Sequence, residues 1–136
     1  DGRVVDGREL CGETQLGRKF VYCTDTIYCE NAVKLARDAD VLIHEATFSH
    51  LDAEMAEQRL HSTSTMAAQV ALNAGVKQLL MTHFSPRYAP GNAIGLENLL
   101  AEAQAIFPNT LMAHDFFTYD IPRRQVLAQP EPVASR

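Results

Sequence analysis

The chain has 136 residues, a length that fits one domain, and its 46% hydrophobic and 21% charged residues are ordinary for a globular protein. A formal net charge of −5, with 12 Lys and Arg, argues against a generic surface for binding polyphosphates. Neither an apolar stretch of membrane-spanning length nor a secretory signal is apparent, and three cysteines give no complete disulfide framework. We therefore expect a cytoplasmic protein with free thiols and no membrane partner.

Short apolar runs alternate with segments of helical periodicity, a pattern typical of an α/β fold. Strands are predicted at residues 19–23, 41–43, 79–82, 110–113 and 116–121. Helices are predicted over residues 30–39, from the cap at Ser62-Thr63 to Gly75, and over 96–107. Residues 49–60 form a polar stretch without a predicted element, and the tail from Pro122 has no core pattern and is expected to be disordered.

Titratable side chains follow each of the first four predicted strands: Asp25, His44 with Glu45, His83, and His114 with Asp115. Because the carboxyl ends of parallel strands gather at one edge of a sheet, these side chains are expected to converge there. His61 would join them from the loop that opens a helix. Mixed histidine and carboxylate ligands suit zinc or another divalent ion, which can activate a water nucleophile. The residues by themselves thus indicate a metal-dependent hydrolase.

Simpler interpretations exist for individual residues in this set. A single histidine at a strand end is more often a hydrogen-bonded structural residue than a metal ligand. His50 lies in the polar stretch and is predicted to be a solvated surface residue. The three cysteines are predicted to pack in the core, with Cys23 a minor candidate ligand because it lies close to Asp25 in the sequence.

Four stretches at these clusters resemble motifs of ribonuclease Z, the tRNA 3′-processing endonuclease family of the metallo-β-lactamase superfamily. The stretches are Tyr22-Cys23-Thr24-Asp25-Thr26, Leu42-Ile43-His44-Glu45-Ala46-Thr47-Phe48, His61-Ser62-Thr63, and Leu80-Met81-Thr82-His83-Phe84-Ser85-Pro86-Arg87-Tyr88. They occur in the family's order, and the His-Glu-Ala-Thr and His-Ser-Thr pair is specific to this family within the superfamily. The resemblance implies an α/β fold, the C-terminal half of a metallo-β-lactamase αββα sandwich, over residues 1–123, followed by a tail at 124–136.

The resemblance also implies a zinc site built partly by this chain. Asp25 would be the carboxylate that bridges two zinc ions, and His83 would bind the second ion. His61 would act as general acid or base near the scissile phosphate, a task that suits a side chain with a pKa near working pH. Glu45 would orient or tune a histidine at the site, either His44 or His61.

Three further roles follow from the same motifs. Ser85 and Arg87 would hold a substrate phosphate, since arginine pairs bidentately with phosphate oxygens. For Arg87 the alternative is an ion pair that fixes the loop. His114 and Asp115 are expected to be structural or to line the cleft.

Several departures from the family pattern limit what this chain is expected to do. The superfamily's His-x-His-x-Asp-His motif, a further zinc-binding histidine and the basic arm that grips tRNA are absent from these residues, and Thr24 replaces the usual glycine before the aspartate. We therefore expect the C-terminal portion of a homodimeric zinc enzyme that removes the 3′ trailer from precursor tRNA, with the chain alone inactive. The alternatives are a non-catalytic half-domain interaction module and a related hydrolase of small phosphodiesters.

Overall fold

The computed structural model describes residues 2, 4–12 and 16–123, and it contains a four-stranded sheet. The strands are β1 (Phe20–Cys23), β2 (Val41–Glu45), β3 (Leu79–Thr82) and β4 (Thr110–Met112). They pair in sequence order and all pairs are parallel, so that Cys23 lies opposite His44, which in turn lies opposite Met81. The predicted α/β class is confirmed, and the carboxyl ends of all four strands lie at one edge of the sheet.

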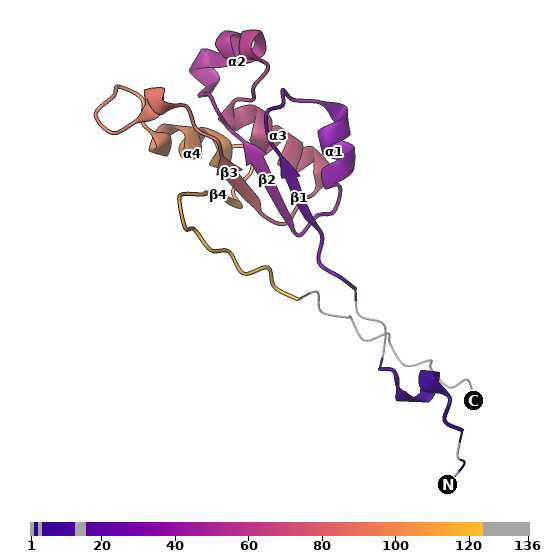
Figure 1. The fold of residues 1–136 in the computed structure, drawn as a ribbon. Helices are drawn as coiled ribbons and strands as arrows, with labels where there is room; N and C mark the ends of the chain where they lie inside the picture. The colour runs from indigo at the N-terminus through magenta and orange to yellow at the C-terminus, as the bar shows by residue number, and fades with distance from the viewer. Residues whose placement is uncertain (1, 3, 13–15, 124–136) are drawn as a thin grey trace, which may run out of the picture.

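Three helices connect consecutive strands and cover the same face of the sheet (Figure 1). They are α1 (Glu30–Ala36), α3 (Ser64–Ala74) and α4 (Leu96–Gln104). Right-handed crossovers between sequentially ordered parallel strands place every connecting helix on one side. The main hydrophobic core lies between these helices and the sheet, and includes Val21, Leu42, Leu79, Met81, Val33, Val70, Ala71 and Ala103.

The ends of α3 follow their sequence signals. The side chain of Thr63 accepts a hydrogen bond from the backbone N–H of Met66, which satisfies one of the free donors of the first turn. Gly75 ends the helix with a φ of 63°, a left-handed conformation that glycine adopts without strain. The other two connecting helices end earlier than predicted, at Ala36 and Gln104, and Asp38 turns the chain with a φ of 55°.

The predicted strand at residues 116–121 is wrong. Within the described residues this segment has no ladder pairing, and it begins at Phe116 with a left-handed φ of 64°. Its alternating residues Phe117, Tyr119 and Ile121 instead line a hollow on the helix-free face of the sheet, together with Phe20 and other apolar residues. The alternation reflects contact with the sheet without hydrogen-bonded pairing.

The polar stretch 49–60, for which no element is predicted, contains the 3-10 helix η2 (His50–Asp52) and the helix α2 (Ala53–Arg59). Only Ala56 is buried in α2, so the helix has no apolar stripe that periodicity could detect. It ends at Leu60, which has a left-handed φ of 59°. Two other 3-10 helices lie at Gly7–Leu10 (η1) and Pro86–Tyr88 (η3).

The helix-free face of the sheet leaves large apolar side chains exposed to solvent. Phe20 and Tyr22 are each 55% exposed, and Leu111 on β4 is 39% exposed. In a parallel sheet both faces are normally covered, so this face has the character of a surface that packs against more protein.

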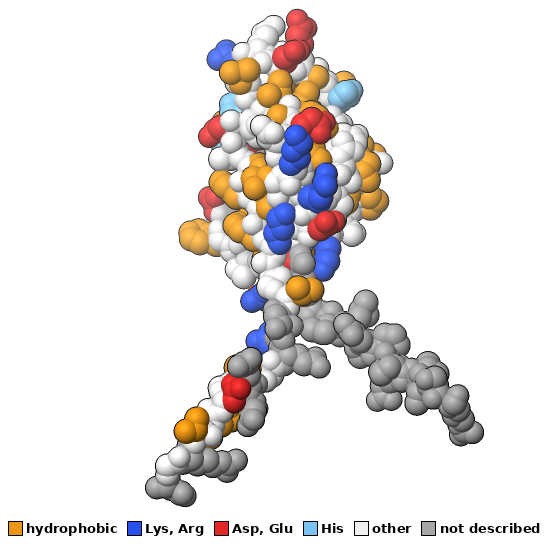
Figure 2. Space-filling view, turned by 90° about the vertical axis from the view of Figure 1, so that its right-hand side faces the viewer, with side chains coloured by type: hydrophobic (Ala, Val, Ile, Leu, Met, Phe, Trp, Pro, Cys, Tyr) orange, Lys and Arg blue, Asp and Glu red, His pale blue; other side chains and the backbone are white. Residues whose placement is uncertain are grey.

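Charged side chains of both signs occur on the surface. Figure 2 shows Lys and Arg side chains lying among Asp and Glu over one side of the molecule, with scattered hydrophobic side chains. No helix in the described part of the chain is long and apolar enough to cross a membrane. The predicted tail at residues 124–136 lies outside the described residues.

Candidate metal and acid–base site

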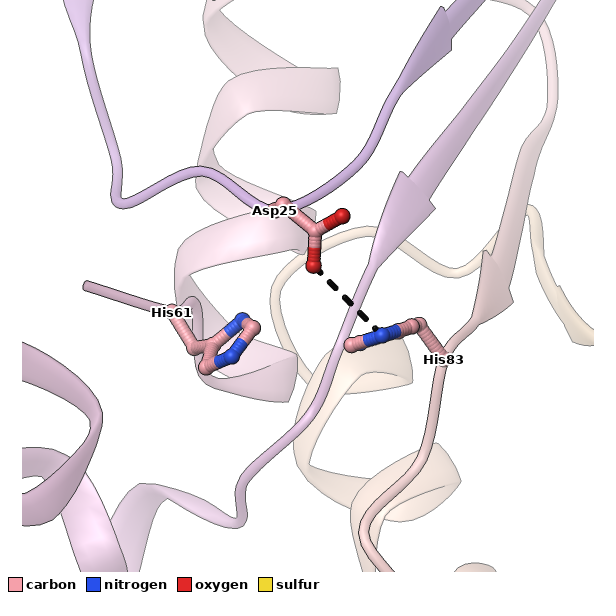
Figure 3. A group of neighbouring side chains, drawn as sticks. All are labelled: Asp25, His61 and His83. Atoms are coloured by element: carbon pink, nitrogen blue, oxygen red, sulfur yellow. Dashed lines mark ion pairs between the residues drawn. The ribbon is translucent and has the colours of Figure 1, made fainter. Parts of the chain in front are cut away.

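Asp25, His61 and His83 meet at the carboxyl edge of the sheet and point toward one another (Figure 3). One ligand atom from each of the three side chains lies within 4.8 Å of the others. His83 Nε2 is 3.5 Å from Asp25 Oδ1, and the rings of His61 and His83 have their centroids 5.3 Å apart. The predicted convergence at this edge is therefore found for these three residues, although they come from three separate segments.

Asp25 and His83 occupy the turns that follow β1 and β3, and both adopt left-handed backbone conformations. Their φ values are 48° and 59°. Asp and His belong to the few non-glycine types that adopt this region with any frequency, and such strain tends to collect at functional sites. Thr24 in place of glycine leaves the turn intact because Asp25 itself takes the positive φ.

Glu45, the last residue of β2, accepts hydrogen bonds from several segments that build this site. Its fully buried carboxylate lies 2.9 Å and 3.1 Å from His61 Nδ1. The backbone N–H groups of Thr26 and Ser62 donate to it at 2.6 Å and 3.0 Å, and the hydroxyl of Thr47 donates at 2.6 Å. One carboxylate thus joins the segments that carry Asp25 and His61, and it reaches His83 through the hydroxyl of Thr47. His44 and His61 are the two histidines predicted as partners of Glu45, and its side chain contacts His61.

The environment of Glu45 keeps its carboxyl ionised. Burial alone raises its pKa, but hydrogen bonds from Thr47, His61, and the backbones of Ser62 and Thr26 outweigh burial, so the pKa lies below its ordinary value of 4.5. An ionised Glu45 accepts the Nδ1–H of His61 and leaves its Nε2 free to exchange a proton or bind a ligand.

The lowered pKa of Glu45 predicts acid destabilisation. A carboxylate whose folded pKa is depressed contributes stability above its unfolded pKa, and that contribution is lost as the pH falls through the folded value. We expect the free energy of unfolding, measured by urea denaturation, to lose this contribution below about pH 4.5. Glu45→Gln should cost about 2–3 kcal/mol at neutral pH and remove the low-pH decline, because hydrogen bonds to a buried charge are lost.

The matched control for Glu45→Gln is Glu57→Gln, at an exposed position of α2. A surface substitution of this kind should change stability by less than about 0.5 kcal/mol. Equal stability of the two variants at neutral pH would contradict the role assigned to the Glu45 carboxylate.

His44 does not join the site, contrary to the expectation that it would converge there. It precedes Glu45 on β2, so its side chain lies on the opposite face of the strand and is fully buried. Its Nδ1 lies 2.8 Å from the backbone oxygen of Glu45, and its Nε2 has no hydrogen-bond partner within the described residues. Burial lowers the pKa of His44, against opposing effects of that backbone oxygen and the Glu45 charge.

Ser85 and Arg87 lie beyond β3, outside the three-residue cluster. The Ser85 hydroxyl caps η3 by accepting from the backbone N–H of Arg87. The guanidinium of Arg87 pairs with Asp52 at 3.3 Å and lies 5.4 Å from the Phe48 ring centroid. This is the ion pair expected of the loop-fixing alternative, and phosphate binding by Ser85 and Arg87 stays a prediction.

The other candidate residues lie outside the cluster. His114 and Asp115, predicted to be structural with lining of the cleft as the alternative, line a hollow of about 430 Å³ together with His83. His50 is exposed, as predicted. All three cysteines are free: Cys23 is buried in the core, where burial raises its pKa, and Cys11 is exposed, so core packing is the wrong prediction for that residue.

Sequence reasoning missed Thr47, which contacts both Glu45 and His83. Its Oγ1 lies 2.6 Å from Glu45 Oε2 and 2.8 Å from His83 Nδ1. Its position in the sequence could have indicated this role. Residues two apart in an extended chain point to the same side, so the hydroxyl of residue 47 is expected on the same side as the carboxylate of residue 45.

The fold and the sequence are similar to those of known proteins. Residues 13–84 match the family described as the beta-lactamase superfamily domain, and the chain belongs to this superfamily. Two solved structures share the fold. The metallo-beta-lactamase fold protein YhfI from Bacillus subtilis matches with a TM-score of 0.55 and 28% identity, over 68% of this chain and 35% of that one. The short form of human tRNase Z matches with a TM-score of 0.51 and 34% identity, over 68% and 29%.

The particular proteins that the chain resembles are ribonucleases Z. It is 70% identical to ribonuclease Z of Nostoc sp. (strain PCC 7120) over 135 residues, which is 99% of this chain and 40% of the relative. It is 71% identical to that of Picosynechococcus sp. (strain PCC 7002), over 95% of this chain and 41% of the relative. The resemblance drawn from the motifs is confirmed. The chain spans about 40% of the length of these relatives.

Proposed function

We propose that this chain is the C-terminal part of a zinc-dependent endoribonuclease that removes the 3′ trailer from precursor tRNA. The observation that carries the proposal is the Glu45–His61 pair facing Asp25 and His83, in a chain 70% identical to a ribonuclease Z. A homodimeric assembly and a cytoplasmic location stay predictions from the resemblance.

The donor atoms at the site fit a divalent metal ion. Asp25 offers a carboxylate oxygen and His83 an imidazole nitrogen, both ligand types that zinc accepts, and other divalent ions accept them too. Both side chains are partly exposed, at 68% and 45%, so an ion can reach them. Bound divalent ions supply charge neutralisation and Lewis acidity at a scissile phosphate. In this proposal Asp25 would be the carboxylate shared by two ions, and His83 would be a ligand of one of them.

His61 is proposed as the proton donor to the departing oxygen. Cleavage that leaves a 3′-hydroxyl on the tRNA breaks the bond between phosphorus and the 3′ oxygen, and that oxygen must gain a proton. Glu45 holds Nδ1 of His61 by a hydrogen bond, so Nε2 is the nitrogen that can deliver the proton. With its side chain 24% exposed, His61 remains accessible to a substrate.

The exposed helix-free face of the sheet supports the proposal that this chain is part of a larger sandwich. Phe20, Tyr22 and Leu111 would be covered by the remainder of the same protein. A separate partner chain on this face is the alternative, an interaction module. The intact mass of the natural product separates the two: a mass near this chain's own favours a module, and a mass at least twice as large favours a fragment of an enzyme.

A cleavage assay tests the proposed activity. With zinc present, we expect the intact protein to cut a precursor tRNA into a tRNA with a 3′-hydroxyl and a free trailer. The 136-residue chain alone should yield no product at ordinary enzyme concentrations, because it lacks the other ligands of a two-metal centre. Zinc-dependent product from the chain alone would contradict the second expectation. Cleavage of a small phosphodiester but not of precursor tRNA by the intact protein would favour a different hydrolase.

A further inference from the structure

Thr47 lies between the Glu45 carboxylate and the imidazole of His83. Its side chain is buried, at 7% exposed, and Oγ1 lies 2.6 Å from Glu45 Oε2 and 2.8 Å from His83 Nδ1. The backbone oxygen of His83 lies 2.9 Å from the same hydroxyl. Thr47 therefore connects the buried carboxylate to a histidine at the exposed edge of the sheet.

Counting protons assigns a direction to these contacts. A threonine hydroxyl has one proton to donate and can accept through its lone pairs. The ionised Glu45 carboxylate can only accept, and at 2.6 Å it is a closer and stronger acceptor than the neutral carbonyl of His83. Thr47 thus gives its proton to Glu45, and the contact with His83 requires that Nδ1 of the imidazole donate to Oγ1.

We infer that Thr47 is a positioning residue that holds His83 in the tautomer with its proton on Nδ1, so that Nε2 presents a lone pair toward Asp25. Glu45 then orients both histidines, His61 by direct contact and His83 through the Thr47 hydroxyl. The inference rests on the proposed metal-binding role of His83.

The geometry on the far side of the His83 ring agrees with this assignment. Nε2 lies 3.5 Å from Asp25 Oδ1, too long for a good hydrogen bond. A lone pair on Nε2 and a carboxylate oxygen at this separation favour a cation between them. Hydrogen-bond partners of a metal-binding histidine commonly fix its tautomer in this way, and their removal typically costs about 10- to 100-fold in metal affinity.

A pair of matched variants tests the inference: Thr47→Val removes the hydroxyl and keeps the shape, and Thr47→Ser restores the hydroxyl. The intact protein is labelled with ¹⁵N at histidine and titrated with Zn²⁺, and NMR follows the His83 nitrogens at about pH 8, above the ordinary imidazole pKa. In the unsubstituted protein and in Thr47→Ser we expect zinc on Nε2 and a protected proton on Nδ1. In Thr47→Val that proton should lose its protection, and the apparent Kd for zinc should rise about 10-fold or more.

Three other outcomes would each contradict a different part of this interpretation. An unchanged Kd and an unchanged Nδ1 signal in Thr47→Val would overturn the role of Thr47 while leaving His83 as a metal ligand. No response of His83 to zinc in the unsubstituted intact protein would overturn the proposed metal role itself. A rise in Kd for Thr47→Val that Thr47→Ser fails to reverse would also count against the hydroxyl, because it would reflect packing alone.

Discussion

His61→Ala in the intact protein should slow precursor-tRNA cleavage by about 100- to 10,000-fold, the usual contribution of a general acid or base. The reason lies in the pairing with Glu45, which holds Nδ1 at 2.9 Å and leaves Nε2 as the proton-transfer atom. The rate constant for cleavage under single-turnover conditions measures the effect without interference from product release. The zinc content of the variant should equal that of the unsubstituted protein.

The matched control is His50→Ala. His50 is exposed, with Nδ1 3.2 Å from the hydroxyl of Thr65, and takes no part in the site cluster. Its replacement should leave cleavage within about twofold of the unsubstituted protein, as expected for a surface residue away from the chemistry. If His61→Ala retained comparable activity, His61 would not be the proton donor. If it lost zinc along with activity, His61 would instead be a metal ligand, consistent with its place beside Asp25 and His83.

Asp25→Asn should weaken zinc binding by more than about 100-fold, a larger loss than removal of a ligand's hydrogen-bond partner causes. The substitution removes the anionic charge at the site and keeps the size of the side chain. Asparagine also tolerates the left-handed conformation that Asp25 adopts at φ 48°, so the turn after β1 should survive. Metal content of the purified intact protein, together with zinc titration, measures the loss.

The control for this variant is Asp115→Asn, since Asp115 is an exposed aspartate that lines the hollow beside His83. Removing a negative charge there should weaken zinc binding far less than removing Asp25, because Asp115 is outside the cluster of potential ligands. Equal effects of the two substitutions would indicate that general charge, and not ligation by Asp25, attracts the ion.

Much of the architecture follows from local sequence patterns. The four strands that form the sheet are short apolar runs, and the helix from Ser64 to Ala74 has both an N-cap threonine and a C-terminal glycine. The positions of Asp25 and His83 follow from the same patterns, because a residue just beyond a parallel strand lies at the ligand-binding edge. These strands, this helix and these two positions depend on interactions between residues close together in the chain, and such interactions can be predicted from a single sequence.

The features that could not be predicted depend on contacts between distant segments. In α2 only Ala56 is buried, so the helix has no apolar periodicity in its sequence. Residues 116–121 alternate in polarity because every second side chain contacts the sheet, although the segment does not pair with it. The side chain of Glu45 contacts His61 and not His44 because of the register of β2, since a shift by one residue would turn the carboxylate to the other face of the sheet. Likewise, the pairing of Arg87 with Asp52 requires knowing that η2 and η3 lie together.

The most direct test of the proposed metal centre is a crystal structure of the intact protein grown with zinc, with anomalous diffraction recorded at the zinc edge. We expect an anomalous peak about 2.0–2.2 Å from both a carboxylate oxygen of Asp25 and Nε2 of His83. We also expect Nδ1 of His61 to be hydrogen-bonded to Glu45 and Nε2 of His61 to be free of metal. Zinc bound elsewhere, with Asp25 and His83 unliganded, would contradict the account.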